Sequence, residues 1–90
     1  MIREVTYDAE ANAAYIYLSD DYPDVQVEID DGTNVDLGMS GYPIGIEVLD
    51  PYRSWPLDEI FTQFPELKAD RTALEGLHQR THWVDTYVRT

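Results

Sequence analysis

The sequence predicts an α+β fold, in which a small antiparallel β-meander of about five strands, or a close relative of it, carries one or two C-terminal helices on one face. Three observations support this. Residues up to Asp50 alternate between apolar and polar with a period of two. Turn sequences rich in Gly, Pro, Asn or Asp separate these runs. Residues after Asp50 change to helical spacing. A chain of 90 residues is expected to form a single domain, with an acidic β part in 1–50 and a helical C-terminal extension in 51–90.

The first part contains five runs that are typical of strands. We expect strands at residues 2–7, 13–19, 24–30, 33–37 and 44–50. In the second run, Ile16 and Leu18 point to one face, and Tyr15 and Tyr17 point to the other. The "DDG" at residues 30–32 favours a type I′-like hairpin turn. Short connections between successive runs favour antiparallel neighbours.

The second part contains two helix candidates. Residues 55–64 place Leu57, Ile60, Phe61 and Phe64 at helical spacing, and Pro65 closes the segment. Residues 70–80 form the second candidate, with Asp70 as the N-cap. Residues 81–88 either extend this helix or form a last strand.

The helices are the only cover for one face of the sheet. We expect eight apolar strand residues on the covered face to contact Leu57, Phe61 and Leu74 of the helices. They are Val25, Val27, Ile29, Val35, Leu37, Ile44, Ile46 and Val48. The opposite face then shows polar groups, and we predict a partner-binding surface made of Tyr15, Tyr17, Glu28, Asp30, Asp36 and Glu47. The simpler alternative is that Tyr15 and Tyr17 only make cross-strand contacts within the sheet.

The net charge of −12 is concentrated in the first part of the chain. Residues 1–50 hold twelve acidic residues and one basic residue, whereas residues 51–90 hold six acidic and five basic residues. A surface of this sign repels nucleic acid and anionic membranes, because binding either requires Lys and Arg. It attracts a basic protein partner. The alternative is that the charge serves solubility alone.

Cysteine is absent, so disulfides, cysteine zinc sites and thiol nucleophiles are excluded. The first residues lack the pattern of a signal peptide, and no apolar run approaches the ~20 residues of a membrane span. We therefore expect a cytoplasmic protein.

The residues that bear chemistry form no complete catalytic motif. His78 and His82 stand four residues apart with Asp85 beyond, but Gln79 occupies the position of the glutamate in a zinc protease motif. The acidic run after Asp30 has its glycine too early for a calcium loop. Glu28, Asp36 and Glu47 share a flat face, which offers no cleft for acid–base catalysis. We expect no catalytic residue, no metal and no cofactor.

Three segments resemble the bacterial domain-of-unknown-function family 2283. They are "YDAEANAAYIYLS" from Tyr7, "DDGTNVDL" from Asp30 and "GIEVLD" from Gly45, within roughly residues 2–52. Asn12 departs from the family pattern, which has an acidic residue there, and "LGMSGYP" replaces an Asp-Gly-rich hairpin. The resemblance implies a small antiparallel β-domain with no established activity, and an antitoxin-like or partner role for some members.

We interpret the chain as a non-enzymatic protein–protein interaction domain, an antitoxin-like or accessory partner of a basic protein. A homodimer is compatible with this interpretation, since a short sheet leaves two edges to pair. The alternative is a small enzyme or ligand-binding protein with a site between the sheet and the C-terminal helices. Its lining would be Tyr52, Arg53, Trp55, His78 and His82.

Overall fold

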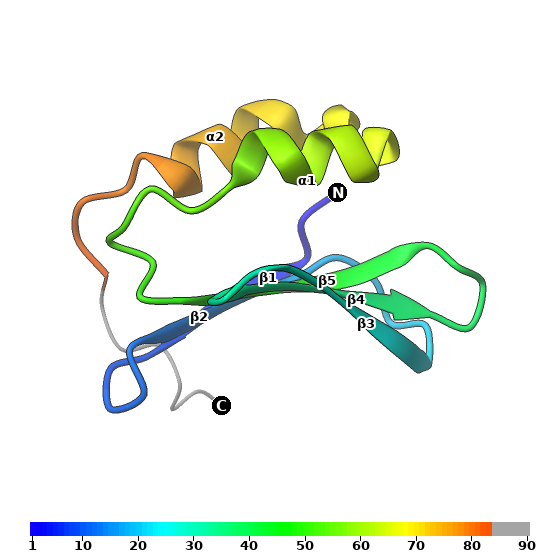
Figure 1. Cartoon of the computed structure of the whole chain (residues 1–90), viewed down its shortest axis with the longest axis horizontal. Coiled ribbons are helices and arrows are strands. Elements are labelled where there is room, and N and C mark those ends of the chain that lie inside the picture. The colour runs from blue at the N-terminus through cyan, green and yellow to red at the C-terminus, as the bar shows by residue number, and fades with distance from the viewer. Residues whose placement is uncertain (84–90) are drawn as a thin grey trace.

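A computed structural model describes residues 1–83 and shows one five-stranded antiparallel sheet below a layer of short helices (Figure 1). The strands are β1 (Glu4–Asp8), β2 (Ala13–Tyr17), β3 (Pro23–Asp30), β4 (Thr33–Gly38) and β5 (Pro43–Leu49). Each paired couple runs antiparallel. The predicted fold class is confirmed.

The strand order is β1-β2-β5-β4-β3, so the sheet is a close relative of a meander rather than a simple one. β5 lies between β2 and β4, and β3 lies at the edge instead of beside β2. Burial accounts for this order. Ile44, Ile46 and Val48 of β5 are all buried, whereas most of β3 is exposed. The strand with the most consistently apolar face thus occupies the centre of the sheet, where helices and neighbours remove it from water.

Three short helical segments follow the sheet: α1 (Leu57–Gln63), the 3₁₀ helix η1 (Pro65–Asp70) and α2 (Arg71–His78). They lie on the same side of the sheet (Figure 1). The two predicted helices are present, with η1 as an additional turn between them. Asp70 stands at the N-cap of α2, but its side chain makes no capping hydrogen bond. Residues 81–83 are neither helix nor strand, and the rest of the predicted 81–88 segment lies outside the described residues.

The hydrophobic core fills the layer between the sheet and the helices. Ile16, Val35, Ile46 and Val48 from the sheet are fully buried and belong to one cluster with the helix side. The helix side contributes Trp55, Leu57, Ile60, Phe61, Phe64, Leu67, Leu74 and Leu77. Each of these side chains stabilises the fold by about 1.5–3 kcal/mol relative to leaving it exposed.

The prediction that eight strand residues of the covered face meet the helices is wrong for Val25, which does not pack against the core cluster. Val25 is 52% exposed, and Val27, Ile29 and Leu37 are only partly buried. The reason is the strand order: within the described part of the chain, β3 is an edge strand whose one neighbour is β4. An alternating pattern predicts a strand with two faces, but it contains no information on whether that strand is central.

The hairpin between β3 and β4 also differs from the prediction. A type I′ turn requires positive φ at both central residues. Among residues 1–83, positive φ occurs at Asn12, Asp50 and Gly41, and not in the Asp31–Gly32 turn. Instead, the Asp30 carboxylate accepts a hydrogen bond from the Gly32 N–H, and a register shift falls between Glu28 and Asp30.

Candidate functional site: the open face of the sheet

The face of the sheet opposite the helices carries two parallel rows of side chains, which we call the open face. Register places these ten residues across all five strands: Thr6, Tyr15, Glu47, Asn34 and Glu28 in one row, and Glu4, Tyr17, Gly45, Asp36 and Gln26 in the other. Four of them are acidic, and none is Lys or Arg. The face is therefore negatively charged.

The centre of the open face is organised by Tyr15. Its ring lies across Gly45, and its hydroxyl donates a 2.6 Å hydrogen bond to Oδ2 of Asp36, two strands away. A Cβ atom at position 45 would overlap the ring of Tyr15. Glycine within a strand often marks such a close approach. Gly45 thus makes the reach from Tyr15 to Asp36 sterically possible.

Neutral donors order the carboxylates of the open face. Asp36 accepts a second hydrogen bond, of 2.8 Å, from the Gln26 amide. Glu47 accepts a 3.1 Å bond from the Asn34 amide. Because these donors carry no charge, they orient the acidic groups without cancelling their negative charge. Partial burial, followed by the bond to Asp36, raises the pKa of the Tyr15 hydroxyl above its ordinary range. Tyr15 therefore stays a neutral donor at physiological pH.

Tyr17 adds an exposed aromatic surface beside this network. Its ring contacts that of Tyr15 edge-on, with 4.5 Å between the centroids, and it is 39% exposed. Edge-on contact holds the ring in place. This ring contact lies within β2, whereas the cross-strand contact is the hydrogen bond from Tyr15 to Asp36 of β4. Both contacts leave Tyr17 accessible.

Five of the six predicted site residues lie together on the open face: Tyr15, Tyr17, Glu28, Asp36 and Glu47. The placement of Asp30 on this face is wrong. Asp30 is paired with the buried Thr33, so its side chain lies on the helix side of the sheet. The register shift after Glu28 reverses the alternation at this point. Sequence reasoning did not include Glu4 and Asn34 in the site, because only the register reveals which rows they join.

Asp30 instead forms an ion pair with Arg53, which follows the last strand. The guanidinium donates to both carboxylate oxygens of Asp30 and to the Thr33 hydroxyl, while its Nε donates to the Leu49 carbonyl. The hydrogen bonds from Arg53 to the Asp30 carboxylate lower the pKa of that group. Arg53 thereby links the β3–β4 hairpin to the end of β5, so the role we assign to Asp30 is structural.

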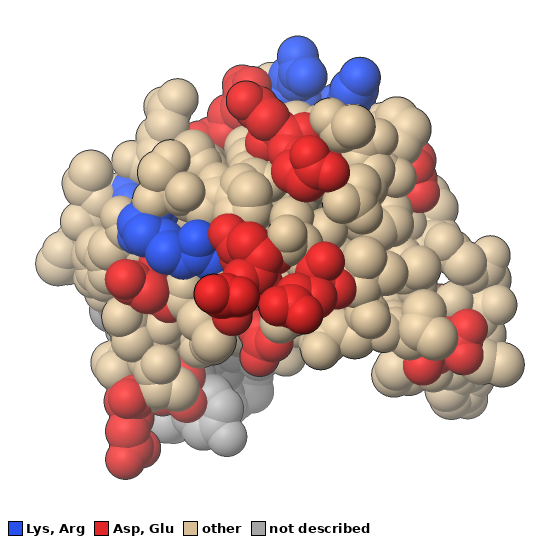
Figure 2. All heavy atoms as spheres, viewed as in Figure 1, with Lys and Arg blue, Asp and Glu red and all other residues tan. Residues whose placement is uncertain are grey.

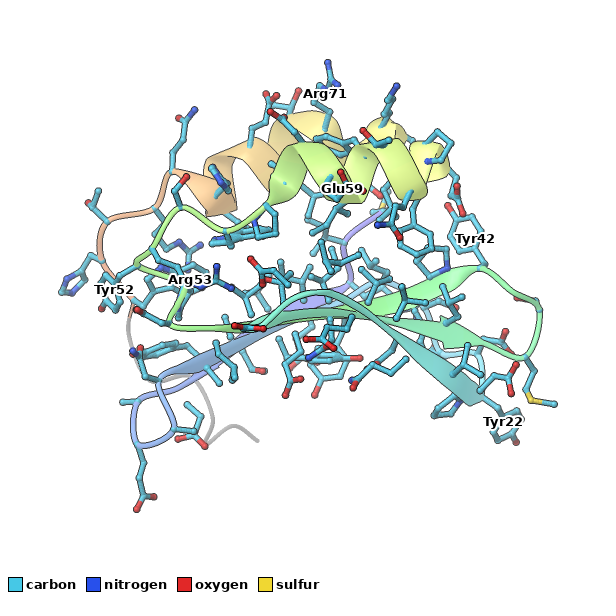
Figure 3. All side chains as sticks on the ribbon, viewed as in Figure 1. Tyr22, Tyr42, Tyr52, Arg53, Glu59 and Arg71 are labelled. Carbon is cyan, nitrogen blue, oxygen red and sulfur yellow. The ribbon has the colours of Figure 1, made fainter. Side chains whose placement is uncertain are left out.

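The alternative site lies at the surface and not between the sheet and the helices. Tyr52, Arg53 and His78 border an open hollow of about 430 Å³, and Trp55 and His78 border a second one of about 510 Å³. His78 is held by a 2.7 Å hydrogen bond to the Trp55 carbonyl. His82 lines neither hollow, and the space beneath the helices is filled by core side chains. Figure 3 shows Tyr52 and Arg53 at one end of the sheet and Tyr22 at the opposite end.

The histidines do not form the helical pair considered from the sequence. α2 ends at His78, so His82 lies beyond the helix. Asp85 lies outside the described residues. Within residues 1–83, no group of three or more His, Asp or Glu side chains is placed to hold a metal ion. In the same part of the chain, no helix is both long and apolar enough to span a membrane.

The fold and its open face define a small α+β domain with an ordered, acidic sheet surface. The family model described as "Protein of unknown function (DUF2283)" matches residues 4–50, which is more than half of the chain. The chain therefore belongs to the DUF2283 family. The match ends at the close of β5 and does not include the helical segments. Neither a curated protein nor a solved structure was found to match the chain.

Proposed function

We propose that the protein is a non-enzymatic interaction domain whose open face binds a basic protein partner, as an antitoxin-like or accessory protein would. The observation that carries this proposal is the composition of the open face. Four carboxylates and two tyrosines share ten positions with no basic residue. A partner that presents Lys or Arg would meet Asp36 and Glu47, whose side-chain hydrogen-bond donors among residues 1–83 are neutral.

The order of the open face supports the same function. Hydrogen bonds hold Tyr15, Asp36 and Glu47 before any partner arrives. Groups that are already ordered lose less conformational freedom when they bind. Tyrosine beside carboxylate suits an arginine-bearing partner, since the ring offers a cation–π surface and the carboxylate a bidentate acceptor.

A capture experiment with two matched variants tests the proposal. The open-face variant combines Glu28→Gln, Asp36→Asn and Glu47→Gln. The control combines Glu10→Gln, Glu66→Gln and Glu75→Gln, which removes three charges at exposed positions on other surfaces. Each protein is immobilised and exposed to an extract of the organism that makes it, at low and high salt.

The proposal expects a basic protein that binds the wild type and the control, is lost from the open-face variant, and is released by salt. Retention of the same proteins by all three baits would contradict the assignment of the open face.

A further inference from the structure

Among residues 1–83, no strand pairs with the outer edge of β3, which lies next to the open face. β3 is the longest strand of the sheet, with eight residues, and it pairs only with β4 in the part of the chain that the structure describes. An unpaired edge presents N–H and C=O groups that accept another strand. Native edges are often protected by lysine or other charges, by proline, by bulges or by a covering segment, and β3 has Pro23 and a register shift near each of its ends. No Lys or Arg lies between Pro23 and Asp30.

The registers show which backbone groups face outward. The Leu49 N–H donates to the Gly32 carbonyl, so Gly32 and Leu49 form a hydrogen-bonded pair. Alternation along the ladder then directs Asn34 and Asp36 toward β5, and directs Val35 and Leu37 toward β3. Their partners Val27 and Val25 therefore face β4. The N–H and C=O groups of Gln26 and Glu28 are left pointing away from the sheet.

Side chains on the two faces of this edge have opposite character. On the open face, Gln26 and Glu28 are exposed and continue the two acidic rows. On the helix side, Val25 is half exposed and Val27 is partly buried. Figure 2 has the same view as Figure 1. It shows acidic side chains gathered near the middle of the surface that faces the viewer.

We infer that β3 accepts an added strand from the partner, an extended segment in which basic and apolar residues alternate. Side chains of an added strand alternate between the two faces. Its basic residues would lie beside Glu28 and the open-face carboxylates, and its apolar residues beside Val25 and Val27. Backbone hydrogen bonds to Gln26 and Glu28 would fix the register. This inference rests on the proposed function, since it specifies how the basic partner is held.

A second copy of the chain fits this edge less well. Antiparallel pairing of two β3 strands centred on Gln26 would set Asp24 of each copy opposite Glu28 of the other. Like charges directly opposite each other are destabilising. A basic strand meets the same positions with opposite charge.

Two peptides of the same composition test the inference on the full-length protein. One alternates Lys and Val over seven residues, and the other groups the same Lys residues before the Val residues; both have blocked ends. Amide hydrogen exchange followed by NMR reports on Gln26 and Glu28, and titration at low salt gives each affinity. We expect the alternating peptide to bind more tightly and to protect both amides.

Two variants at one position separate strand addition from charge attraction. Gln26→Ala and Gln26→Pro both remove the side-chain amide of the glutamine, but only the proline also removes the backbone N–H that points outward. We expect Gln26→Pro to weaken binding of the alternating peptide about tenfold relative to Gln26→Ala. If Gln26→Pro does not fold, the test is whether the alternating peptide protects the Gln26 and Glu28 amides of the wild type against hydrogen exchange.

Equal affinity for the two peptides, without protection of these amides, would overturn strand addition and leave the open-face proposal standing. Protection that increases with protein concentration in the absence of peptide would assign the edge to a second copy and also overturn the inference. The open-face proposal fails separately, if its charge variant and the matched control capture the same proteins.

Discussion

At the scale of single residues, the arrangement of Tyr15, Gly45 and Asp36 makes a specific prediction about stability. Tyr15→Phe removes only the hydroxyl bond to Asp36 and should lower the free energy of unfolding by about 1 kcal/mol. Gly45→Ala should lower it by more, about 1–3 kcal/mol, because the new methyl group displaces the ring. Urea denaturation measures both changes.

Gly76→Ala provides the control for the glycine substitution. A Cβ at position 76 meets nothing within 4 Å, and the residue lies within α2. This change should stabilise the protein by up to about 1 kcal/mol through helix propensity. If Gly45→Ala behaved as Gly76→Ala does, the close approach of Tyr15 to Gly45 would be disproved.

The raised pKa of Tyr15 predicts a loss of stability in alkaline solution. Its ordinary value is 10.0, and partial burial together with the Asp36 bond raises the pKa in the folded protein. The unfolded chain therefore releases this proton first as the pH rises. The stabilising contribution is complete below pH 10 and is lost as the pH rises toward the folded-state pKa. As the pH rises above 10, the free energy of unfolding should fall more steeply for the wild type than for Tyr15→Phe. Parallel curves for the two proteins would contradict this assignment.

At the scale of secondary-structure elements, β3 and β5 both alternate between two faces but lie in different environments. Ile46 is fully buried in the central strand, and Val25 is half exposed in the edge strand. Ile46→Ala should therefore cost about 2–5 kcal/mol of stability. Val25→Thr should cost less than about 0.5 kcal/mol. Denaturation of the two variants checks the contrast, and a large loss in Val25→Thr would show that the β3 edge is covered in solution.

This contrast also shows what the sequence alone could predict. Alternation correctly assigned Tyr15, Tyr17, Asp36 and Glu47 to one face, because a period of two determines sides. Strand order depends on contacts between distant segments, so the central place of β5 could not be derived from local pattern. Asp30 was misplaced for a related reason: a register shift moves a side chain to the other face and leaves no clear mark in composition. The glycine within β5 was a usable signal, since Gly45 interrupts an otherwise regular strand.

At the scale of the whole molecule, the net charge of −12 gives folding and partner binding opposite responses to salt. Residues 1–50 carry most of this charge, and the ordered carboxylates of the open face have neutral donors instead of cations. Repulsion among them opposes the compact state, and salt screens that repulsion. Raising NaCl from about 20 mM to about 0.5 M should therefore increase the free energy of unfolding, by about 1 kcal/mol. The same increase in NaCl should weaken binding of the basic partner, because screening also reduces the attraction between the two proteins. Parallel urea denaturation and binding titrations measure both quantities.

The open-face charge variant should gain less stability with salt than the wild type. The control variant shows the effect of removing the same number of charges from other surfaces. A wild-type stability that falls with NaCl would show that attractive ion pairs, such as Arg53 with Asp30, outweigh the repulsion among the carboxylates.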